Sequence, residues 1–411
     1  MPPSRRSFIG AAGGLIAAPA FALPAIEPFH GNHQAGIATP QQKHTYLAAF
    51  DVVARKPSDL ARLLQLWTAA AARLSAGLPV ADISADDITI ADGGSARGLD
   101  PARLTLTFGF GPTLFDNAGQ DRFGLKARRP AALVDLPRFN GDQLEPARTG
   151  GDLSVQACAD DPQVVFHAIR ELSRIGYGQT RIRWGQTGFM PDTRAAGTPR
   201  NLMGFKDGTN NPDPAGRRAA NPNLPRDFNQ VVWVGGDGPA WMRGGSYMVT
   251  RRIRISLEHW DQTPVDYQEE VVGRHKASGA PLGRTHEFAP LDLSATTADG
   301  IPVVPVNSHA RLGSVIANNG AQMFRRGYSY NDATSVTAER WPPWRQGMMF
   351  DSGLLFVSYQ RDPRTGFIPV FDRMSKMDAM NQFTTHVGSG LFACPPGVGG
   401  GFIGQALFES T

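Results

Sequence analysis

The most informative stretch of the chain is Gly204-Phe205-Lys206-Asp207-Gly208-Thr209-Asn210-Asn211-Pro212. It places the carboxylate of Asp207 inside a run of small and turn-forming residues. Glycines adopt backbone angles that other residues resist, and the Asn-Asn-Pro end is typical of a loop. Such a loop can bring backbone amides and one acid close to a ligand. Because a bare GxxDG pattern is more often an ordinary turn, the specificity lies in the full string.

Further segments follow it in order along the chain. Asn307–Leu312 contains His309, and Arg325–Tyr330 begins with two adjacent arginines. Gly353–Asp362 is an apolar run that reads as a strand and ends in an acid.

Together these segments resemble those of the dye-decolorizing (DyP-type) haem peroxidases, over roughly residues 40–411. The resemblance implies an α+β fold of two ferredoxin-like domains, of the dimeric α+β barrel type, with haem bound mainly in the C-terminal half. It implies haem b (iron protoporphyrin IX) as cofactor, and hydrogen peroxide with a small reducing substrate such as a dye or phenol as reactants. Exported members that resemble this chain include deferrochelatase/peroxidase proteins.

The resemblance also implies roles for single residues. His309 matches the axial ligand of the iron, and Asp207 matches the acid–base that moves the proton of peroxide. Arg325 matches the distal arginine that stabilises developing charge, with Arg326 as the alternative. Asn211 matches a further distal polar residue.

Other residues are expected to hold the cofactor. The backbone of Gly208, Thr209 and Asn210 is expected to line the haem edge, and Arg311 to pair with a haem propionate. Asp362 is the expected carboxylate partner of His309, since a metal-bound histidine normally donates its other ring nitrogen to an acid. Two alternatives stay open, because Arg311 also reads as a surface arginine and Asp362 as a turn residue before Pro363.

Composition narrows the possible partners. The 411 residues are 41% hydrophobic and 19% charged, which suits a globular protein of two domains. The net charge of +4 is small, and there is no basic stripe with interleaved aromatics, so we expect no nucleic-acid partner. Cys158 and Cys394 lie outside any C-x-x-C-H motif, which excludes covalent haem attachment. Buried small hydrophobes are their expected role.

The N-terminus reads as an export signal. Ser4–Ile9 is a twin-arginine pattern, and an apolar run follows to Ala22. The run is too short to span a membrane, so we expect a cleaved signal peptide over residues 1–25, no stable membrane insertion, and a periplasmic or extracellular protein. The twin-arginine machinery is then a partner, and an iron-uptake system and a second copy of the chain remain open as others.

The remaining chain divides into three parts. Residues 26–43 read as a flexible lead-in, residues 44–215 as an N-terminal ferredoxin-like domain that includes the Asp207 loop, and residues 216–411 as a C-terminal haem domain. The predicted elements follow the order strand, helix, strand in each half. They are strands over Thr45–Val53, Leu104–Phe110, Asp152–Cys158, Thr180–Trp184, Gly245–Leu257 and Gly353–Gln360, with helices from Pro57, from Pro162, over Asp261–Val272 and over Phe367–His386.

Competing functions are release of iron from haem with the porphyrin intact, a haem carrier without turnover, and chlorite dismutase. A carrier has no use for a distal acid and arginine, and a chlorite dismutase is not expected to contain the string 204–212. Electrons could reach the haem through surface aromatics, with Trp341, Trp344, Tyr328 and Tyr330 as candidates.

Overall fold

The structure is a computed structural model that describes residues 25–82, 91–191, 197–214, 227–338 and 346–409. The predicted signal peptide, apart from Ala25, and the candidates Trp341 and Trp344 lie outside these ranges. Within them, no helix is long and apolar enough to cross a membrane.

The N-terminal half has the strand–helix–strand order that its sequence patterns predict. Its elements are β1 (His44–Val52), α1 (Pro57–Ser75), β2 (Thr105–Phe110), α2 (Pro112–Phe115), β3 (Leu153–Ala159), α3 (Pro162–Ile175) and β4 (Thr180–Phe189). The local signals account for the helix starts. Pro57 opens α1, and the Asp161 side chain caps α3 by accepting from the backbone N–H groups of Gln163 and Val164.

The C-terminal half repeats strands and helices with longer strands. Its elements are α4 (Phe228–Val232), β5 (Ser246–Ile255), α5 (Leu257–Asp261), α6 (Val265–Val272), α7 (His309–Leu312), β6 (Phe324–Arg325), β7 (Tyr328–Ala338), β8 (Gln346–Gln360), α8 (Phe367–Met377) and β9 (Thr384–Cys394). Short 3₁₀ turns span Lys126–Arg128, Pro146–Arg148, Ala240–Met242, Ala379–Gln382 and Gln405–Leu407.

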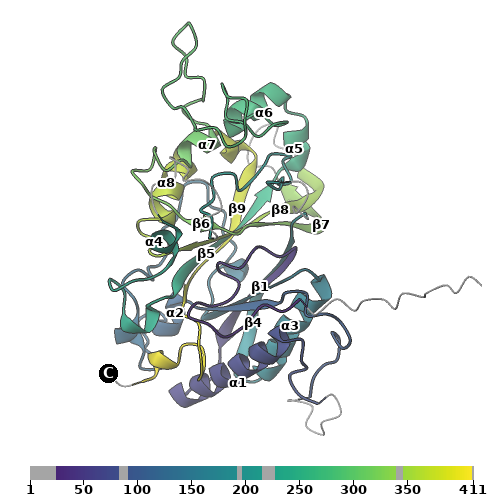
Figure 1. Cartoon of the computed structure of the whole chain (residues 1–411), viewed down its shortest axis with the longest axis vertical. Coiled ribbons are helices and arrows are strands. Elements are labelled where there is room, and N and C mark those ends of the chain that lie inside the picture. Colours follow the sequence, from purple (N-terminus) through teal and green to yellow (C-terminus); the bar gives the residue numbers. More distant parts are fainter. Residues whose placement is uncertain (1–24, 83–90, 192–196, 215–226, 339–345, 410–411) are drawn as a thin grey trace, which may run out of the picture.

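All strands belong to one antiparallel sheet that closes on itself. The order is β5-β9-β2-β3-β1-β4-β7-β8-β6, and β5 also pairs with β8. The two halves meet at two narrow seams, where Phe110 of β2 pairs with Ala393 of β9 and Phe189 of β4 pairs with Ser329 of β7. Figure 1 shows α1 and α3 below the strands of the N-terminal half and α5 to α8 above the strands of the C-terminal half.

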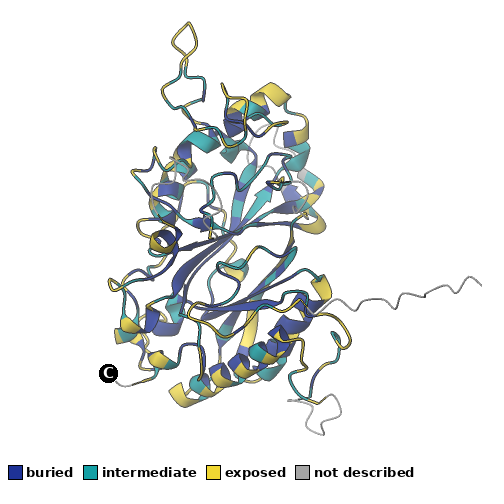
Figure 2. Ribbon diagram, in the orientation of Figure 1, coloured by how far each residue is buried: buried dark blue, intermediate teal, exposed yellow. Residues whose placement is uncertain are grey.

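Alternation along the strands sorts side chains between the inside of the ring and its helix-covered outside. On β1, Leu47 and Ala49 point inward to a cluster with Met248 and Phe392, whereas Phe50 packs outward against α1 and α3. The buried strands and the exposed outer faces of the helices are visible in Figure 2. On β5 the same alternation sends Ile253 and Ile255 outward, toward the helices of the C-terminal half.

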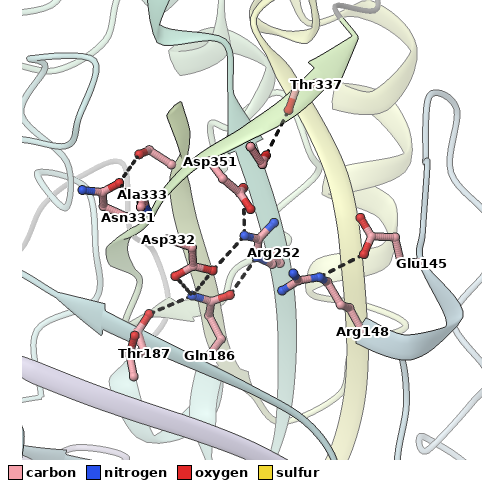
Figure 3. Close-up of polar contacts among 12 residues, drawn as sticks. Glu145, Arg148, Gln186, Thr187, Arg252, Asn331, Asp332, Ala333, Thr337 and Asp351 are labelled. Atoms are coloured by element: carbon pink, nitrogen blue, oxygen red, sulfur yellow. Dashed lines mark hydrogen bonds and ion pairs between the residues drawn. The ribbon is translucent and has the colours of Figure 1, made fainter. Parts of the chain in front are cut away.

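A buried arginine ties the two halves together inside the ring (Figure 3). Arg252 of β5 donates to Gln186 of β4 at 2.7 Å, to Asp332 of β7 at 3.0 Å and to Asp351 of β8 at 2.9 Å. Its guanidinium also lies 4.2 Å from the centre of the Tyr330 ring. Because two carboxylates and an aromatic face surround one cation, the charge is compensated where it is buried.

Three sequence predictions about the fold are wrong. The single helix expected over Asp261–Val272 is not observed, because α5 ends at Asp261 and α6 begins only at Val265. The helix expected over Phe367–His386 ends at Met377, and Thr384 begins β9. The segment 26–43 is not a flexible lead-in. Ile37 is fully buried, and the amide of buried Gln34 bonds to the Phe108 and Pro395 carbonyls at 3.0 and 2.8 Å. The sequence of this segment shows no helix or strand periodicity, because isolated side chains such as Ile37 and Gln34, and not one face of a regular element, are buried.

Candidate active site

One large cavity lies between the outer face of β5 and β8 and the helices α7 and α8. Apolar side chains form most of its walls, among them Ile253, Ile255, Leu354, Phe356, Phe367, Val370, Phe371 and Met374. The loop 201–210 forms another wall, and it contacts the C-terminal half. A flat apolar ligand with a few polar groups suits such a cavity.

His309 is the first residue of α7 and lines the cavity. Its Nδ1 lies 2.7 Å from Oδ2 of Asp378, so Nε2 is the ring nitrogen left to act as a metal ligand. Burial lowers the pKa of His309, but the Asp378 carboxylate raises it, and the balance leaves the pKa above its ordinary value. An imidazole held in this way has the partner that metal-bound histidines usually have.

The expectation that Asp362 would be this partner is wrong. Asp362 instead forms an ion pair with Arg364 two residues later, at 2.7 Å, and is not part of the cavity wall. Asp378 takes its place because α8 stops at Met377 and the chain turns there. The Asp378 Oδ1 accepts from the backbone N–H of Met380, while its Oδ2 reaches His309.

Asp207 and Arg325 form an ion pair on the same cavity. Arg325 Nη1 lies 3.1 Å from Oδ1 of Asp207, and each side chain is 33% exposed. Their charges are close enough to His309 to perturb its pKa, Asp207 raising it and Arg325 lowering it. The alternative Arg326 is 2% exposed and donates instead to the Thr39 carbonyl and to Gln42, away from the cavity.

The loop that carries Asp207 is held in shape from both sides. Gly208 has a φ of 111°, which a residue with a Cβ rarely adopts. Glu287 accepts from Lys206 Nζ at 2.5 Å and from Thr209 Oγ1 at 3.0 Å. It is therefore hydrogen-bonded to the residues on both sides of Asp207-Gly208. Gly208, Thr209 and Asn210 line the cavity.

Asn211 is bonded to the backbone of Arg325 and is not part of the cavity wall. Its Nδ2 donates to the Arg325 carbonyl at 2.8 Å, and its Oδ1 accepts from the Arg325 backbone N–H at 2.8 Å. Both ends of the amide are thus occupied by the backbone of Arg325, and the role of Asn211 as a further distal polar residue stays a prediction. Asn211 fixes the backbone of Arg325 relative to the Asp207 loop.

Arg311 does not support the predicted propionate contact. Its guanidinium donates to the Val304 carbonyl at 3.0 Å, and it is not part of the cavity wall. Four other cations line the cavity, and three of them pair with a carboxylate: Lys206 with Glu287, Arg251 with Asp142, and Arg325 with Asp207. The fourth, Arg274, donates from Nη1 to the Gly279 and Glu287 carbonyls at 2.7 and 3.1 Å.

Sequence reasoning therefore missed Asp378, Glu287 and Arg274. None of them stands in a motif that composition or periodicity marks. The one available signal was the stop in α8, where Asp378 is a helix-capping residue type inside an apolar run. Tyr328 and Tyr330 were predicted as surface aromatics that pass electrons to the haem. They are 1% and 0% exposed, so neither is a surface residue.

Comparison with known proteins identifies the class. The N-terminal and C-terminal models of the Dyp-type peroxidase family match residues 34–190 and 198–399. The chain belongs to the Dyp-type peroxidase family, and it is therefore an enzyme of the haem peroxidase class.

Individual relatives cover nearly the whole chain. A dye-decolorizing peroxidase of Thermobifida fusca is 40% identical over 92% of this chain and 84% of the relative. A deferrochelatase of Shigella flexneri is 38% identical over 93% of this chain and 88% of the relative. The structure of ferric DtpA from Streptomyces lividans superposes on this chain with a TM-score of 0.82 at 40% sequence identity. The superposition covers 95% of this chain and 100% of DtpA.

Proposed function

We propose that the cavity binds haem b, with His309 as the axial ligand, and that the enzyme uses hydrogen peroxide to oxidise small one-electron donors such as dyes and phenols. The side chains around the cavity fit a haem group. One imidazole has its second nitrogen on a carboxylate, the walls are apolar, and an acid and an arginine lie on the same cavity. We also propose that the two halves are ferredoxin-like modules, with haem bound mainly by the C-terminal one.

The observation that carries the proposal is the Asp207–Arg325 pair at 3.1 Å on the cavity that His309 lines. Haem iron, when bound, supplies the site at which peroxide coordinates and is reduced. Asp207 would accept the proton of the incoming peroxide and return it to the oxygen that leaves. Arg325 would stabilise the negative charge that develops on that oxygen, and a pre-set cation does this at little reorganisation cost.

Other residues hold the cofactor and the pair in place. Asp378 orients His309, Glu287 fixes the Asp207 loop and Asn211 fixes the Arg325 backbone. We propose Arg274 as the partner of a haem propionate, because it is the cation on this cavity without a carboxylate in hydrogen-bond contact among the described residues.

The test is stopped-flow mixing of haem-loaded protein with hydrogen peroxide, following the Soret band. Asp207→Asn keeps the shape but accepts no proton at neutral pH, so the rate should fall about 100-fold or more. Arg325→Leu removes the charge but keeps the backbone bonds to Asn211, and Asp261→Asn, a surface acid on α5, is the control. If Asp207→Asn reacts as fast as wild type while Arg325→Leu does not react, Asp207 is not the acid–base.

The second candidate function is removal of iron from haem with the porphyrin left intact. The relatives named deferrochelatase, 38% identical over 93% of this chain, favour it. The test is incubation of the protein with haem and a reductant, followed by chromatographic detection of metal-free porphyrin. Recovery of haem alone, with peroxidase turnover intact, would restrict the enzyme to the first function.

We further propose export by the twin-arginine machinery to the periplasm or the cell exterior. The Ser4–Ile9 pattern and the apolar run after it support this proposal. That route carries folded proteins, which suits a cofactor enclosed between a sheet and helices. An iron-uptake system becomes a partner only if the deferrochelatase function holds.

A further inference from the structure

A second group of ligand-type side chains lies in the N-terminal half. Asp92, His167 and Glu171 each offer one atom within 4.8 Å of the others. They are 7%, 4% and 0% exposed, and none of them is part of the haem cavity wall. His167 and Glu171 are four residues apart on α3 and so share one face of the helix, while Asp92 comes from the loop before β2.

The buried charges of this group are incompletely compensated. Glu171 pairs with Arg174 and accepts from the Gly93 backbone N–H at 3.2 Å. Asp92 accepts from the backbone N–H groups of Val80 and Gly94 at 2.9 and 2.7 Å. Among the described residues its one ion-pair partner is His167, whose Nε2 is 3.8 Å from Asp92 Oδ2, too far for a hydrogen bond. A cation beside Asp92 would stabilise this buried carboxylate further.

His167 lies between the two carboxylates, with Nε2 3.8 Å from Asp92 Oδ2 and Nδ1 4.0 Å from Glu171 Oε1. Its Nδ1 lies 2.8 Å from the Ser95 hydroxyl, which can accept the Nδ1 proton and leave the Nε2 lone pair directed away from it. Two ligand atoms that share a metal at about 2.0–2.2 Å each lie at most about 4.4 Å apart. The 3.8 Å between Nε2 and the Asp92 carboxylate is within that limit.

An adjoining cavity gives access. It has a volume of about 420 Å³, and both Asp92 and His167 line it. Arg73 lines the same cavity, but its Nε donates to the Pro79 carbonyl. Water can therefore reach the group and complete the coordination of an ion.

We propose that Asp92, His167 and Glu171 bind a divalent transition metal, for which one imidazole and two carboxylates make Zn²⁺ the best match. The ion ties the loop that carries Asp92 to helix α3. It supplies a cation to Asp92, since Glu171 already pairs with Arg174, and its role is structural and independent of haem.

The experiment uses the haem-loaded full chain, freed of metal with EDTA and titrated with ZnCl₂ in a calorimeter. We expect one Zn²⁺ per chain and a rise in the thermal unfolding midpoint. His167→Gln and Glu171→Gln should each weaken Zn²⁺ binding at least 10-fold, with the Soret spectrum unchanged. His275→Gln is the matched control, because it removes a more exposed histidine that also lies beside a glutamate, at 2.7 Å from Glu269.

Two results would overturn the proposal. One is wild-type protein that binds no Zn²⁺. The other is Zn²⁺ binding that neither substitution weakens. If the variants do not fold, Co²⁺ added to the metal-free wild type decides, since visible bands of nitrogen and oxygen coordination are expected and their absence contradicts the site.

Discussion

Replacing Asp378 by asparagine tests the support of the axial ligand. Asp378 Oδ2 lies 2.7 Å from His309 Nδ1, and the Asp378 side chain is 3% exposed. The substitution keeps the shape but leaves one oxygen, so an amide that accepts from His309 Nδ1–H turns its NH2 group toward the Met380 N–H. It removes the charge, so a charge-assisted hydrogen bond worth about 1.5–3 kcal/mol becomes a neutral one worth about 1 kcal/mol. The resulting loss of about 0.5–2 kcal/mol corresponds to roughly 2–30-fold. Changes to the partners of metal ligands cost about 10–100-fold in metal affinity. The two estimates overlap at about 10–30-fold weaker haem binding.

The assay is titration of haem-free protein with haem, following the Soret band to obtain the dissociation constant. His309→Ala sets the upper limit, and we expect it to lose or loosen haem. Asp362→Asn is the matched control, because that carboxylate pairs with Arg364 instead. Unchanged affinity in Asp378→Asn together with weaker binding in Asp362→Asn would refute the assignment of Asp378 as the partner of His309.

Three further predictions concern the rest of the machinery. Burial raises the pKa of Glu287, but its bonds to Lys206 and Thr209 and the charge of Lys206 bring the pKa below the usual 4.5. This stabilisation is complete above pH 4.5 and is lost as the pH falls through the lowered pKa. Glu287→Gln should therefore reduce the free energy of unfolding in urea by about 1–3 kcal/mol at pH 7 and by much less at pH 3, and an equal loss at both pH values would contradict this. Asn211→Ala should slow the reaction with peroxide about 10- to 100-fold in stopped flow, because Arg325 loses its backbone support, and a wild-type rate would show that the support is unnecessary. Arg5→Lys combined with Arg6→Lys should leave the protein in the cytoplasm on fractionation, whereas normal recovery of mature protein outside would rule out twin-arginine export.

The fold was predictable where strands and helices carry their own periodicity. Leu60, Leu63, Leu64 and Trp67 mark α1 in the sequence, and all of them are buried. β9 was missed because Gly388 and Gly390 disfavour a strand by propensity. A Cβ at Gly388 would lie 2.8 Å from the Arg148 carbonyl oxygen, and one at Gly390 would lie 2.6 Å from the Phe392 ring. Close packing, which only the fold reveals, requires glycine at both positions.

The candidate site divides in the same way. His309, Asp207 and Arg325 are found from motifs because each stands in a distinctive local string. Asp378 is 69 residues from His309 along the chain, and Glu287 is 81 residues from Lys206. Such contacts depend on how loops meet in space, and no local pattern encodes them. The helix prediction over Phe367–His386 failed at Asp378 itself, where the chain departs from the periodic pattern to serve the site.

The closed sheet has a consequence for how the protein would fail. An unpaired strand edge is a template for pairing with another chain, and a ring protects its edges by pairing each strand on both sides. Here the protection is thinnest at the two seams, where single residue pairs, Phe110 with Ala393 and Phe189 with Ser329, join the halves. Opening either seam would expose two edges at once. Substitutions that weaken the pairing at either seam should therefore cause aggregation first, while the cavity on the outer face of β5 and β8 still holds its ligand.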